Sequence, residues 1–435
     1  MRTLPERPYL RALLANAGWL MADRLLRLVL GVFIGAWVAR YLGPESYGEL
    51  AYGVAFLAVF QALSALSLEG VLVREVSQRP QRSGMLVGTA FCLRLAVSVL
   101  AWAAACLAVR LMRPEDTRAL LIVGILGLGM LFQSTDVIET WLQSQMRSRL
   151  SVSAKAFAYC TTSVIKILLV LNEAPLWTFA LALTLDAALA AGALLIAYRR
   201  HRALSRWSWD GETARLMLRE TAPFLLASLA MAAFARVDQI MLRELAGDHA
   251  LGVYSAALPF SLVWQMLAVA AYVSLLPRLS SLRIQDEAMY ARRLQQCFIL
   301  FLWCGVLVAA TMALLADVLL THLLGAAYAE SVDVLRVHAL SNIFYFLGIA
   351  RNLATVAERR SAIALWSALA GLFVNLMALL LLVPRFGGQG AAWAAVISSA
   401  CSAYLVQRIL DPRVFRMQSR AFNVARLFRP AADGR

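Results

Sequence analysis

The sequence predicts an all-α polytopic membrane protein with about twelve transmembrane helices in two six-helix lobes. Of its 435 residues, 61% are hydrophobic and only 15% are charged, whereas ordinary soluble domains carry about 25% charged residues. The mean hydropathy is +0.70. Apolar stretches of about 20 residues recur along the chain, and each is long enough to cross a hydrocarbon core of roughly 30 Å as a helix. The main solvent of this chain is therefore the bilayer.

Six apolar stretches separated by polar breaks occupy the first half of the chain. They are Leu14–Val38, Leu50–Leu68, Gly84–Val109, Ala119–Leu142, Val152–Leu171 and Trp177–Tyr198. Six more follow the polar stretch Arg199–Glu220, namely Thr221–Leu242, Leu251–Leu276, Cys297–Leu320, Val334–Val356, Ile363–Val383 and Ala391–Ile409. These stretches predict an N-terminal lobe at 1–203, a linker at 204–220, a C-terminal lobe at 221–410 and a basic tail at 411–435.

The charge of the connections predicts the orientation in the membrane. Alternate connections carry groups of arginines, such as Arg74 with Arg79 and Arg82, or Arg199 with Arg200. The positive-inside rule places these connections, the linker and both termini in the cytoplasm. The connections on the other side are short and carry little positive charge, and only Arg110–Arg118 disagrees with the pattern.

The net charge of +15 and the six cysteines exclude several classes of protein. Because the positive charge follows the predicted topology, it indicates contact with anionic lipid rather than nucleic acid. All six cysteines fall inside apolar stretches and form no C-x-x-C pair, so neither a disulfide framework nor a zinc site is expected. The first apolar stretch contains Asp23, Arg24 and Arg27 and is too long for a cleavable signal peptide.

An internal repeat connects the two halves. At one constant offset, five residues recur with the same identity: Gly43, Gly48, Phe56, Arg74 and Ser77 correspond to Gly247, Gly252, Phe260, Arg278 and Ser281. Six stretches separate the copies, so both have the same orientation in the membrane. This is the pattern of parallel repeats, which places two lobes around a central cavity.

Several cations lie at membrane depth, where insertion of one charge costs about 2.5–3.5 kcal/mol. Six of them are candidates for a cavity that binds an anion: Arg24, Arg27, Arg94, Lys166, Arg236 and Arg351. Lys155, Thr162 and Lys166 follow at spacings of seven and four, which places them on one helix face. The alternative is pairing or snorkelling to an interface, above all for Arg40, Arg336, Arg351 and Lys155, which lie near the ends of their stretches.

Three carboxylates at membrane depth are candidates for coupling transport to a cation, H⁺ or Na⁺. They are Asp136, Glu139 and Asp238. Structural pairing with Arg236 or Lys166 is the alternative role. A surplus of buried positive charge predicts an anionic guest, and the planar fork of arginine suits phosphate oxygens particularly well.

Signals for an enzyme, a metal or a cofactor do not occur in this sequence. No G-x-x-x-x-G-K-[ST] motif is present, so a P-loop nucleotide site is not expected. The four histidines are scattered singly, which indicates no metal site, and no G-x-S-x-G motif occurs. We therefore expect no catalytic residue and no cofactor.

Four stretches resemble a known family of transporters. They are ARYLGPESYGELAYGVAF at Ala39–Phe56, FQSTDVIETWLQSQMRSRLSVSAK at Phe132–Lys155, VDQIMLRELAGDHALGVYSAA at Val237–Ala257, and LLGAAYAESVDVLRVHALSNIFYFLGIARN at Leu323–Asn352. The chain resembles the polysaccharide transporters, or Wzx-type oligosaccharide flippases, within the larger group that includes multidrug exporters and the lipid II flippase. The likeness runs through most of the chain, although none of these stretches identifies the sugar.

The resemblance implies a MATE-like fold whose two lobes alternate between inward and outward access. It also implies a substrate, an undecaprenyl-diphosphate-linked oligosaccharide, that crosses the bacterial inner membrane for O-antigen, capsule or exopolysaccharide synthesis. Membrane lipids, a polysaccharide polymerase and glycosyltransferases are then the expected partners. The alternatives are a lipid II flippase, which typically has two further spans, a cation-coupled multidrug exporter, and an integral glycosyltransferase or polymerase, which usually has a large outward loop.

Overall fold

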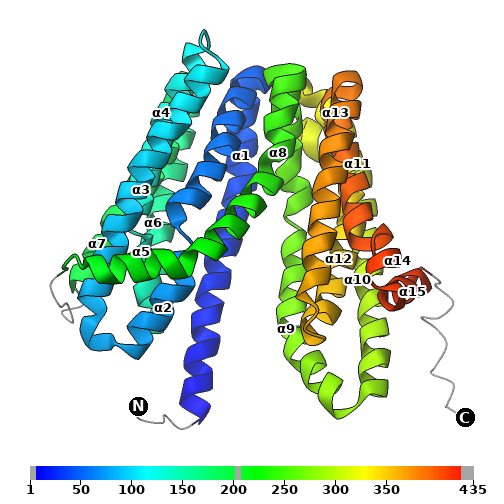
Figure 1. Ribbon diagram of the computed structural model, residues 1–435. Coiled ribbons are helices and arrows are strands. Elements are labelled where there is room, and N and C mark those ends of the chain that lie inside the picture. The colour runs from blue at the N-terminus through cyan, green and yellow to red at the C-terminus, as the bar shows by residue number, and fades with distance from the viewer. Residues whose placement is uncertain (1–5, 201–206, 423–435) are drawn as a thin grey trace, which may run out of the picture. The chain divides into compact units, whose positions relative to one another are not determined.

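The computed structural model describes residues 6–200 and 207–422 and contains no β-strand in these ranges, so the all-α prediction is confirmed (Figure 1). The first helices are α1 (Glu6–Ala65), α2 (Leu68–Gln78), α3 (Ser83–Met112), α4 (Thr117–Gln133), α5 (Asp136–Ser144), α6 (Ser148–Leu171) and α7 (Leu176–Arg200). They are followed by α8 (Gly211–Leu262), α9 (Gln265–Gln285), α10 (Glu287–Leu324), α11 (Ala329–Ala339), α12 (Ser341–Ala357), α13 (Ser361–Ala400), α14 (Gln407–Leu410) and α15 (Pro412–Ala421). A short π-helix, Cys401–Leu405, lies between α13 and α14.

Nine helical segments of the described chain are long and apolar enough to cross a membrane. The three longest, Leu25–Gln78, Gly211–Gln285 and Ala362–Leu410, have 54, 75 and 49 residues, far more than the roughly 20 that one crossing requires. Each of them contains a glycine with non-helical backbone angles, at Gly43, Gly247 and Gly387. The chain is thus multi-pass. The expected twelve spans require each of these long segments to cross twice, and this number stays a prediction.

Three of the helix junctions share one glycine conformation. Gly43 (φ 73°, ψ 167°), Gly247 (φ 83°, ψ 179°) and Gly325 (φ 84°, ψ 178°) lie in a region that is essentially restricted to glycine. At Gly43 and Gly247 one helical segment follows the other without an intervening loop, and at Gly325 a single 3-10 turn, Ala326–Tyr328, leads from α10 to α11. A side chain at any of these positions costs about 1–3 kcal/mol of backbone strain.

The internal repeat has a counterpart in the packing around two of these junctions. A Cβ atom at Gly48 would lie 1.9 Å from the carbonyl oxygen of Asp248, and one at Gly252 would lie 1.8 Å from that of Pro44. Pro44 and Gly48 correspond to Asp248 and Gly252 at the offset that the sequence predicts. The two contacts are therefore equivalent under the repeat, and both require glycine because the backbones touch.

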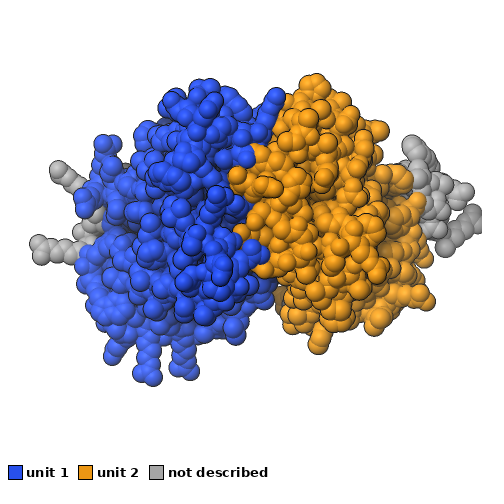
Figure 2. Space-filling view, turned by 90° about the horizontal axis from the view of Figure 1, so that it is seen from above, with its two compact units in different colours: residues 1–42, 49–236 blue, residues 43–48, 237–435 orange. Residues whose placement is uncertain are grey.

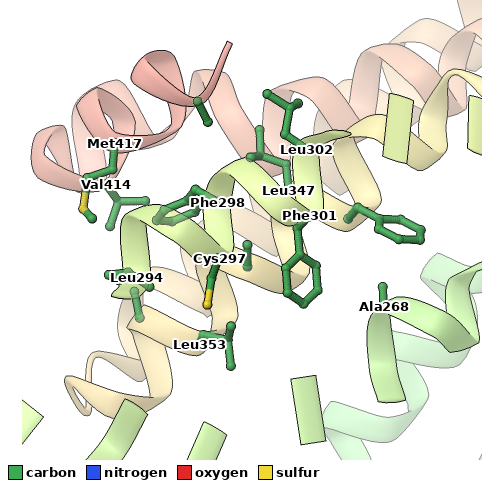
Figure 3. Close-up of a cluster of buried hydrophobic side chains, with 14 of the residues drawn as sticks. Ala268, Leu294, Cys297, Phe298, Phe301, Leu302, Leu347, Leu353, Val414 and Met417 are labelled. Atoms are coloured by element: carbon green, nitrogen blue, oxygen red, sulfur yellow. The ribbon is translucent and has the colours of Figure 1, made fainter. Parts of the chain in front are cut away.

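The described helices form two compact units (Figure 2). Unit 1 contains residues up to Leu42 and Glu49–Arg236, and unit 2 contains Gly43–Gly48 with the residues from Val237 onward. The core of unit 1 contains buried side chains of α2, α3, α5 and α7, among them Leu72, Val87, Ile138 and Leu194. The core of unit 2 joins α9, α10, α12 and α15 (Figure 3). The predicted functional division into lobes at 1–203 and 221–410 stays a prediction.

Parts of the predicted linker and tail are helical. Residues 201–206 and 423–435 lie outside the described residues, but α8 already begins at Gly211 and α15 occupies Pro412–Ala421. The carboxylate of Asp210 caps α8 by accepting hydrogen bonds from the backbone N–H and the hydroxyl of Thr213, which lowers the pKa of Asp210. The amphipathic α15 becomes visible only in the structure.

Candidate functional site

A polar stripe runs along α6, which packs against α5 and α7 in unit 1 (Figure 1). Lys155, Tyr159, Thr162 and Lys166 follow one another at spacings of four, three and four residues. With 3.6 residues per turn these positions share one helix face. The sequence predicts this face from Lys155, Thr162 and Lys166, and the structure adds Tyr159 to it.

Lys155 belongs to an ion cluster of four residues that we call the α6 ion cluster. Its Nζ lies 2.8 Å from Oδ1 of Asp136 and also contacts the carboxylate of Glu139. A guanidinium nitrogen of Arg94, on α3, lies 3.9 Å from Oδ2 of the same Asp136. Three helices, α3, α5 and α6, thus contribute two cations and two carboxylates, and the cluster is formally neutral.

The side chains of the α6 ion cluster differ in their exposure. The Arg94 side chain is 7% exposed, whereas that of Asp136 is 28% exposed. Arg94 therefore lies underneath, where it holds Asp136, and the accessible groups are those of Lys155, Asp136 and Glu139. The sequence predicts that Arg94 faces a cavity and gives Asp136 and Glu139 as candidates for cation coupling or for structural pairing. The structure brings all three together with Lys155, so their charges act as one group.

Further along the same face, the ring of Tyr159 makes cation–π contacts with two cations. The Arg27 guanidinium lies 4.9 Å from the centroid of the Tyr159 ring and the Lys166 ammonium lies 5.8 Å from it. The Tyr159 hydroxyl also donates a hydrogen bond of 3.2 Å to the backbone carbonyl of Arg27 on α1. Two of the predicted cations thus meet on one aromatic ring, which attracts them through its quadrupole.

Asp186 on α7 completes this second group. It accepts a hydrogen bond of 3.1 Å from the Thr162 hydroxyl and interacts electrostatically with Lys166. Neither Asp186 nor Tyr159 is among the sequence candidates. Both could have been identified from the sequence, because Asp186 is an ionisable residue inside the stretch Trp177–Tyr198 and Tyr159 lies four residues after Lys155.

We expect the aromatic ring of Tyr159 to stabilise unit 1 more than its hydroxyl does. Tyr159→Phe removes a hydrogen bond worth about 1 kcal/mol but keeps the ring between Arg27 and Lys166. Tyr159→Leu also removes the two cation–π contacts, worth about 0.5–2 kcal/mol each. In thermal unfolding of the purified protein in detergent, the melting temperature should therefore be highest for wild type, lower for the phenylalanine variant and lowest for the leucine variant. Equal melting temperatures for the two variants would contradict this role of the ring.

Two further candidates, Arg236 and Asp238, lie on α8. The carboxylate of Asp238 accepts a hydrogen bond of 2.6 Å from the hydroxyl of Tyr254, whose side chain is fully buried. The ring of Tyr254 in turn lies 6.1 Å from that of His338. Arg236 is half-buried, and its side chain makes no ion pair with another described residue. The structure does not pair Arg236 with Asp238.

Arg351 on α12 is buried, and its guanidinium donates to a backbone carbonyl rather than to a carboxylate. One guanidinium nitrogen donates a hydrogen bond of 2.7 Å to the carbonyl of Ser402, inside the π-helix, and another donates to the side chain of Asn352 at 3.0 Å. Within residues 6–200 and 207–422 no acidic group forms an ion pair with Arg351. Arg351 is thereby attached to this irregular turn. No direct contact joins it to Asp238.

The remaining candidate, Arg24, lies on α1, but its side chain is outside the described residues. No group of three His, Cys, Asp or Glu side chains that could hold a metal ion is found in the described part of the chain. Five of the nine candidates therefore lie around α6: Arg27, Arg94, Asp136, Glu139 and Lys166.

Comparisons with known proteins agree with this architecture. A family model described as "Polysaccharide biosynthesis protein" matches residues 13–283. No curated protein matches the sequence. Among solved structures, the lipid II flippase MurJ in an inward closed conformation is similar over 92% of this chain and 90% of its own, with a TM-score of 0.74 and 15% identity.

Two further solved structures share the fold. An inward-facing multidrug resistance MATE family transporter of the MOP superfamily has a TM-score of 0.71 and 13% identity, covering 91% of this chain and 96% of its own. A MOP superfamily transporter from Pyrococcus furiosus has a TM-score of 0.61 and 15% identity, covering 94% and 95%. At these identities the similarity establishes the fold and leaves the substrate open.

Proposed function

The chain belongs to the polysaccharide biosynthesis protein family and has the fold of MOP-superfamily transporters, and from this premise we propose that it is a flippase for a polyprenyl-diphosphate-linked oligosaccharide. The substrate moves from the cytoplasmic to the outer leaflet of the bacterial inner membrane, and both termini of the chain lie in the cytoplasm. The family and the fold are those of transporters rather than enzymes.

Such a protein lowers the free-energy barrier that arises from desolvation of the substrate headgroup. The sugar hydroxyls and the charged diphosphate would lose their water together in the bilayer, at several kcal/mol for each unsatisfied group. A polar path through the protein replaces that water with fixed charges and hydrogen-bonding groups. Since the cytoplasm is negative, outward movement of the anion is also favoured by roughly 2.3 kcal/mol per charge per 100 mV.

The polar stripe of α6 is the observation that carries the proposal. It places Lys155 and Lys166 on one helix face at membrane depth and adds Arg27 from α1 at Tyr159. These are the three cations of the stripe whose side chains are not deeply buried, and guanidinium and ammonium groups are the usual ligands of phosphate oxygens. We assign diphosphate binding to Arg27, Lys155 and Lys166, with Arg94 as the residue that positions Asp136.

Coupling to a cation follows from the same cluster. Asp136 and Glu139 both contact Lys155, so an incoming diphosphate competes with them for the ammonium group. A proton on either carboxylate adds one positive charge to the α6 ion cluster and favours the anion, and loss of the proton favours its release. Asp238 with Tyr254 is the corresponding candidate in unit 2. A polymerase and glycosyltransferases would consume and supply the lipid-linked sugar.

We expect Arg27→Glu to reduce transport strongly. The change reverses the charge beside Tyr159, where the structure places Lys166 as the second cation. The purified protein is reconstituted in liposomes that contain a fluorescent polyprenyl-diphosphate-linked sugar, and a membrane-impermeant quencher reports how fast the headgroup changes leaflet. Wild type should accelerate this movement, and the variant should reduce the rate at least roughly tenfold, as expected when one charge contact of about 1.4 kcal/mol or more is lost.

Arg110→Glu is the matched control, because Arg110 is exposed near the end of α3 and belongs to neither group of α6. It should retain the wild-type rate. If wild type moves lipid II but no other headgroup, the substrate assignment is wrong. If it moves small cationic drugs but no lipid-linked sugar, the protein is a multidrug exporter instead.

A further inference from the structure

A cavity of about 550 Å³ lies between the first turns of α10 and the C-terminal helix α15, entirely within unit 2. Its volume is in the range of about 300–1,000 Å³ that is usual for small-molecule sites. Four arginines line it, one from α10 and three from α15: Arg292, Arg413, Arg416 and Arg420. Ile299 and Met417 form an apolar part of the wall.

The position of α15 on α10 is defined by packing and by two hydrogen bonds. Val414 and Met417 of α15 are buried against Leu294 and Phe298 of α10 (Figure 3). The side chain of Gln295 donates to the carbonyl of Met417 at 3.0 Å, and the indole of Trp303 donates to that of Ala421 at 3.3 Å. Helix α15 is therefore an amphipathic helix whose apolar face is covered by α10.

The polar face of α15 is directed at the cavity. Arg413, Arg416 and Arg420 follow at spacings of three and four, so they share this face. Arg413 pairs with Glu358 at 3.3 Å. Among the described residues, no carboxylate forms an ion pair with Arg416, Arg420 or Arg292. Three positive charges thus converge on one cavity without a protein anion to balance them.

The surroundings of the cavity favour a lipid over a soluble anion. After the polar turns that carry Arg292, Gln295 and Gln296, residues 297–316 of α10 contain no charged side chain, and α10 is long and apolar enough to cross a membrane. A charged helix start followed by about 20 uncharged apolar residues is typical of a span that enters the bilayer there. We therefore expect the arginines to lie near the end of the hydrocarbon region, where an acyl chain can contact Ile299 and Met417 while a phosphate reaches the guanidinium groups. Basic pockets at this depth suit anionic lipid headgroups.

We propose that the cavity between α10 and α15 binds the phosphate headgroup of an anionic phospholipid, in the leaflet on the side of the C-terminus. The lipid would neutralise Arg292, Arg416 and Arg420 and connect α15 to the membrane surface. This site is separate from the α6 stripe, and the proposal does not depend on the transported substrate.

The test measures lipid binding directly on the full-length protein. Purified protein in detergent is mixed with phosphatidylglycerol, with phosphatidylcholine or with inorganic phosphate, and native mass spectrometry counts the bound molecules. Wild type should retain phosphatidylglycerol in preference to phosphatidylcholine. The double variant Arg416→Gln/Arg420→Gln should bind phosphatidylglycerol roughly thirtyfold more weakly, because each arginine near the surface contributes about 1 kcal/mol and a loss of about 2 kcal/mol corresponds to a factor of roughly 30.

A second pair of arginines provides the matched control. Arg199→Gln/Arg200→Gln removes the same charge from two exposed residues at the end of α7 in unit 1 and should leave the retention unchanged. Arg292→Gln, on α10, tests the same cavity without altering α15 and should also weaken binding. Equal retention of phosphatidylcholine, an equal loss in the control, or displacement of the lipid by inorganic phosphate would each overturn the proposal. Transport is not measured, so these outcomes are independent of the proposed flippase activity.

Discussion

Replacing Gly252 with alanine is expected to prevent accumulation of the folded protein. The new Cβ would lie 1.8 Å from the carbonyl oxygen of Pro44 and 2.6 Å from its carbonyl carbon, far inside the contact distance of any two atoms. Both partners are backbone, so no rotamer change can relieve the overlap. The two helices must separate, which should cost about 3 kcal/mol or more, the upper end of overpacking penalties.

The measurement is the yield of monodisperse protein from membranes together with its thermal unfolding in detergent. Gly35→Ala and Gly192→Ala are matched controls, because a Cβ at either glycine has nothing within 4 Å. Alanine is also the better helix former, so these controls should unfold at or above the wild-type temperature. A Gly252→Ala protein with wild-type yield and stability would show that the helices do not touch here.

The equivalent contact in the other copy of the repeat provides a second variant for this experiment. Gly48 contacts the Asp248 carbonyl as Gly252 contacts that of Pro44, so Gly48→Ala should be about as harmful. A large difference between the two variants would mean that the equivalent contacts contribute unequally to stability.

Replacing Lys155 with methionine is expected to reduce both stability and transport. The change leaves Asp136 and Glu139 without the ammonium group that both contact, and only Arg94 remains near Asp136. Breaking a buried ion pair costs about 3–5 kcal/mol. Because the Lys155 side chain is still 23% exposed, we expect a smaller loss than for a fully buried pair, roughly 1–3 kcal/mol.

A double variant separates stability from function. Lys155→Met/Glu139→Gln removes one charge of each sign and leaves the pair Arg94 with Asp136, so the α6 ion cluster stays neutral. We expect this protein to recover most of the lost thermal stability while transport of the lipid-linked sugar in liposomes stays low. If transport recovers together with stability, Lys155 has a structural role and the assignment to diphosphate binding is wrong.

Local periodicity explains what could be predicted of the fold. Each predicted apolar stretch is helical over most of its length, and the repeat that relates Gly43 to Gly247 reappears as a shared backbone conformation. These features depend on residues that are near one another in the chain. The break between α4 and α5 inside the stretch Ala119–Leu142 was not predicted, because the interruption of two residues, Ser134 and Thr135, changes the hydropathy little.

The candidate site was predictable along one helix but not between helices. The spacing of Lys155 and Lys166 places both on one face of α6, whatever packs against it. That Arg94 would hold Asp136, that Asp136 and Glu139 would share Lys155, and that Arg351 would bind the carbonyl of Ser402 depends on partners from other helices. The sequence therefore identifies the charged residues, whereas the partner of each charge is known only from the structure.

By itself the sequence determined that this chain resides in a membrane, how its apolar stretches are ordered, and which of its helices carry charge. Those properties follow from hydropathy and from the constant rise and turn of an α-helix, which act over a few neighbouring residues. Only the tertiary structure decided which charges neutralise one another and that Arg292 faces three arginines of α15. The physical reason is that an electrostatic interaction depends on a distance of a few ångströms between side chains, and helix packing sets that distance.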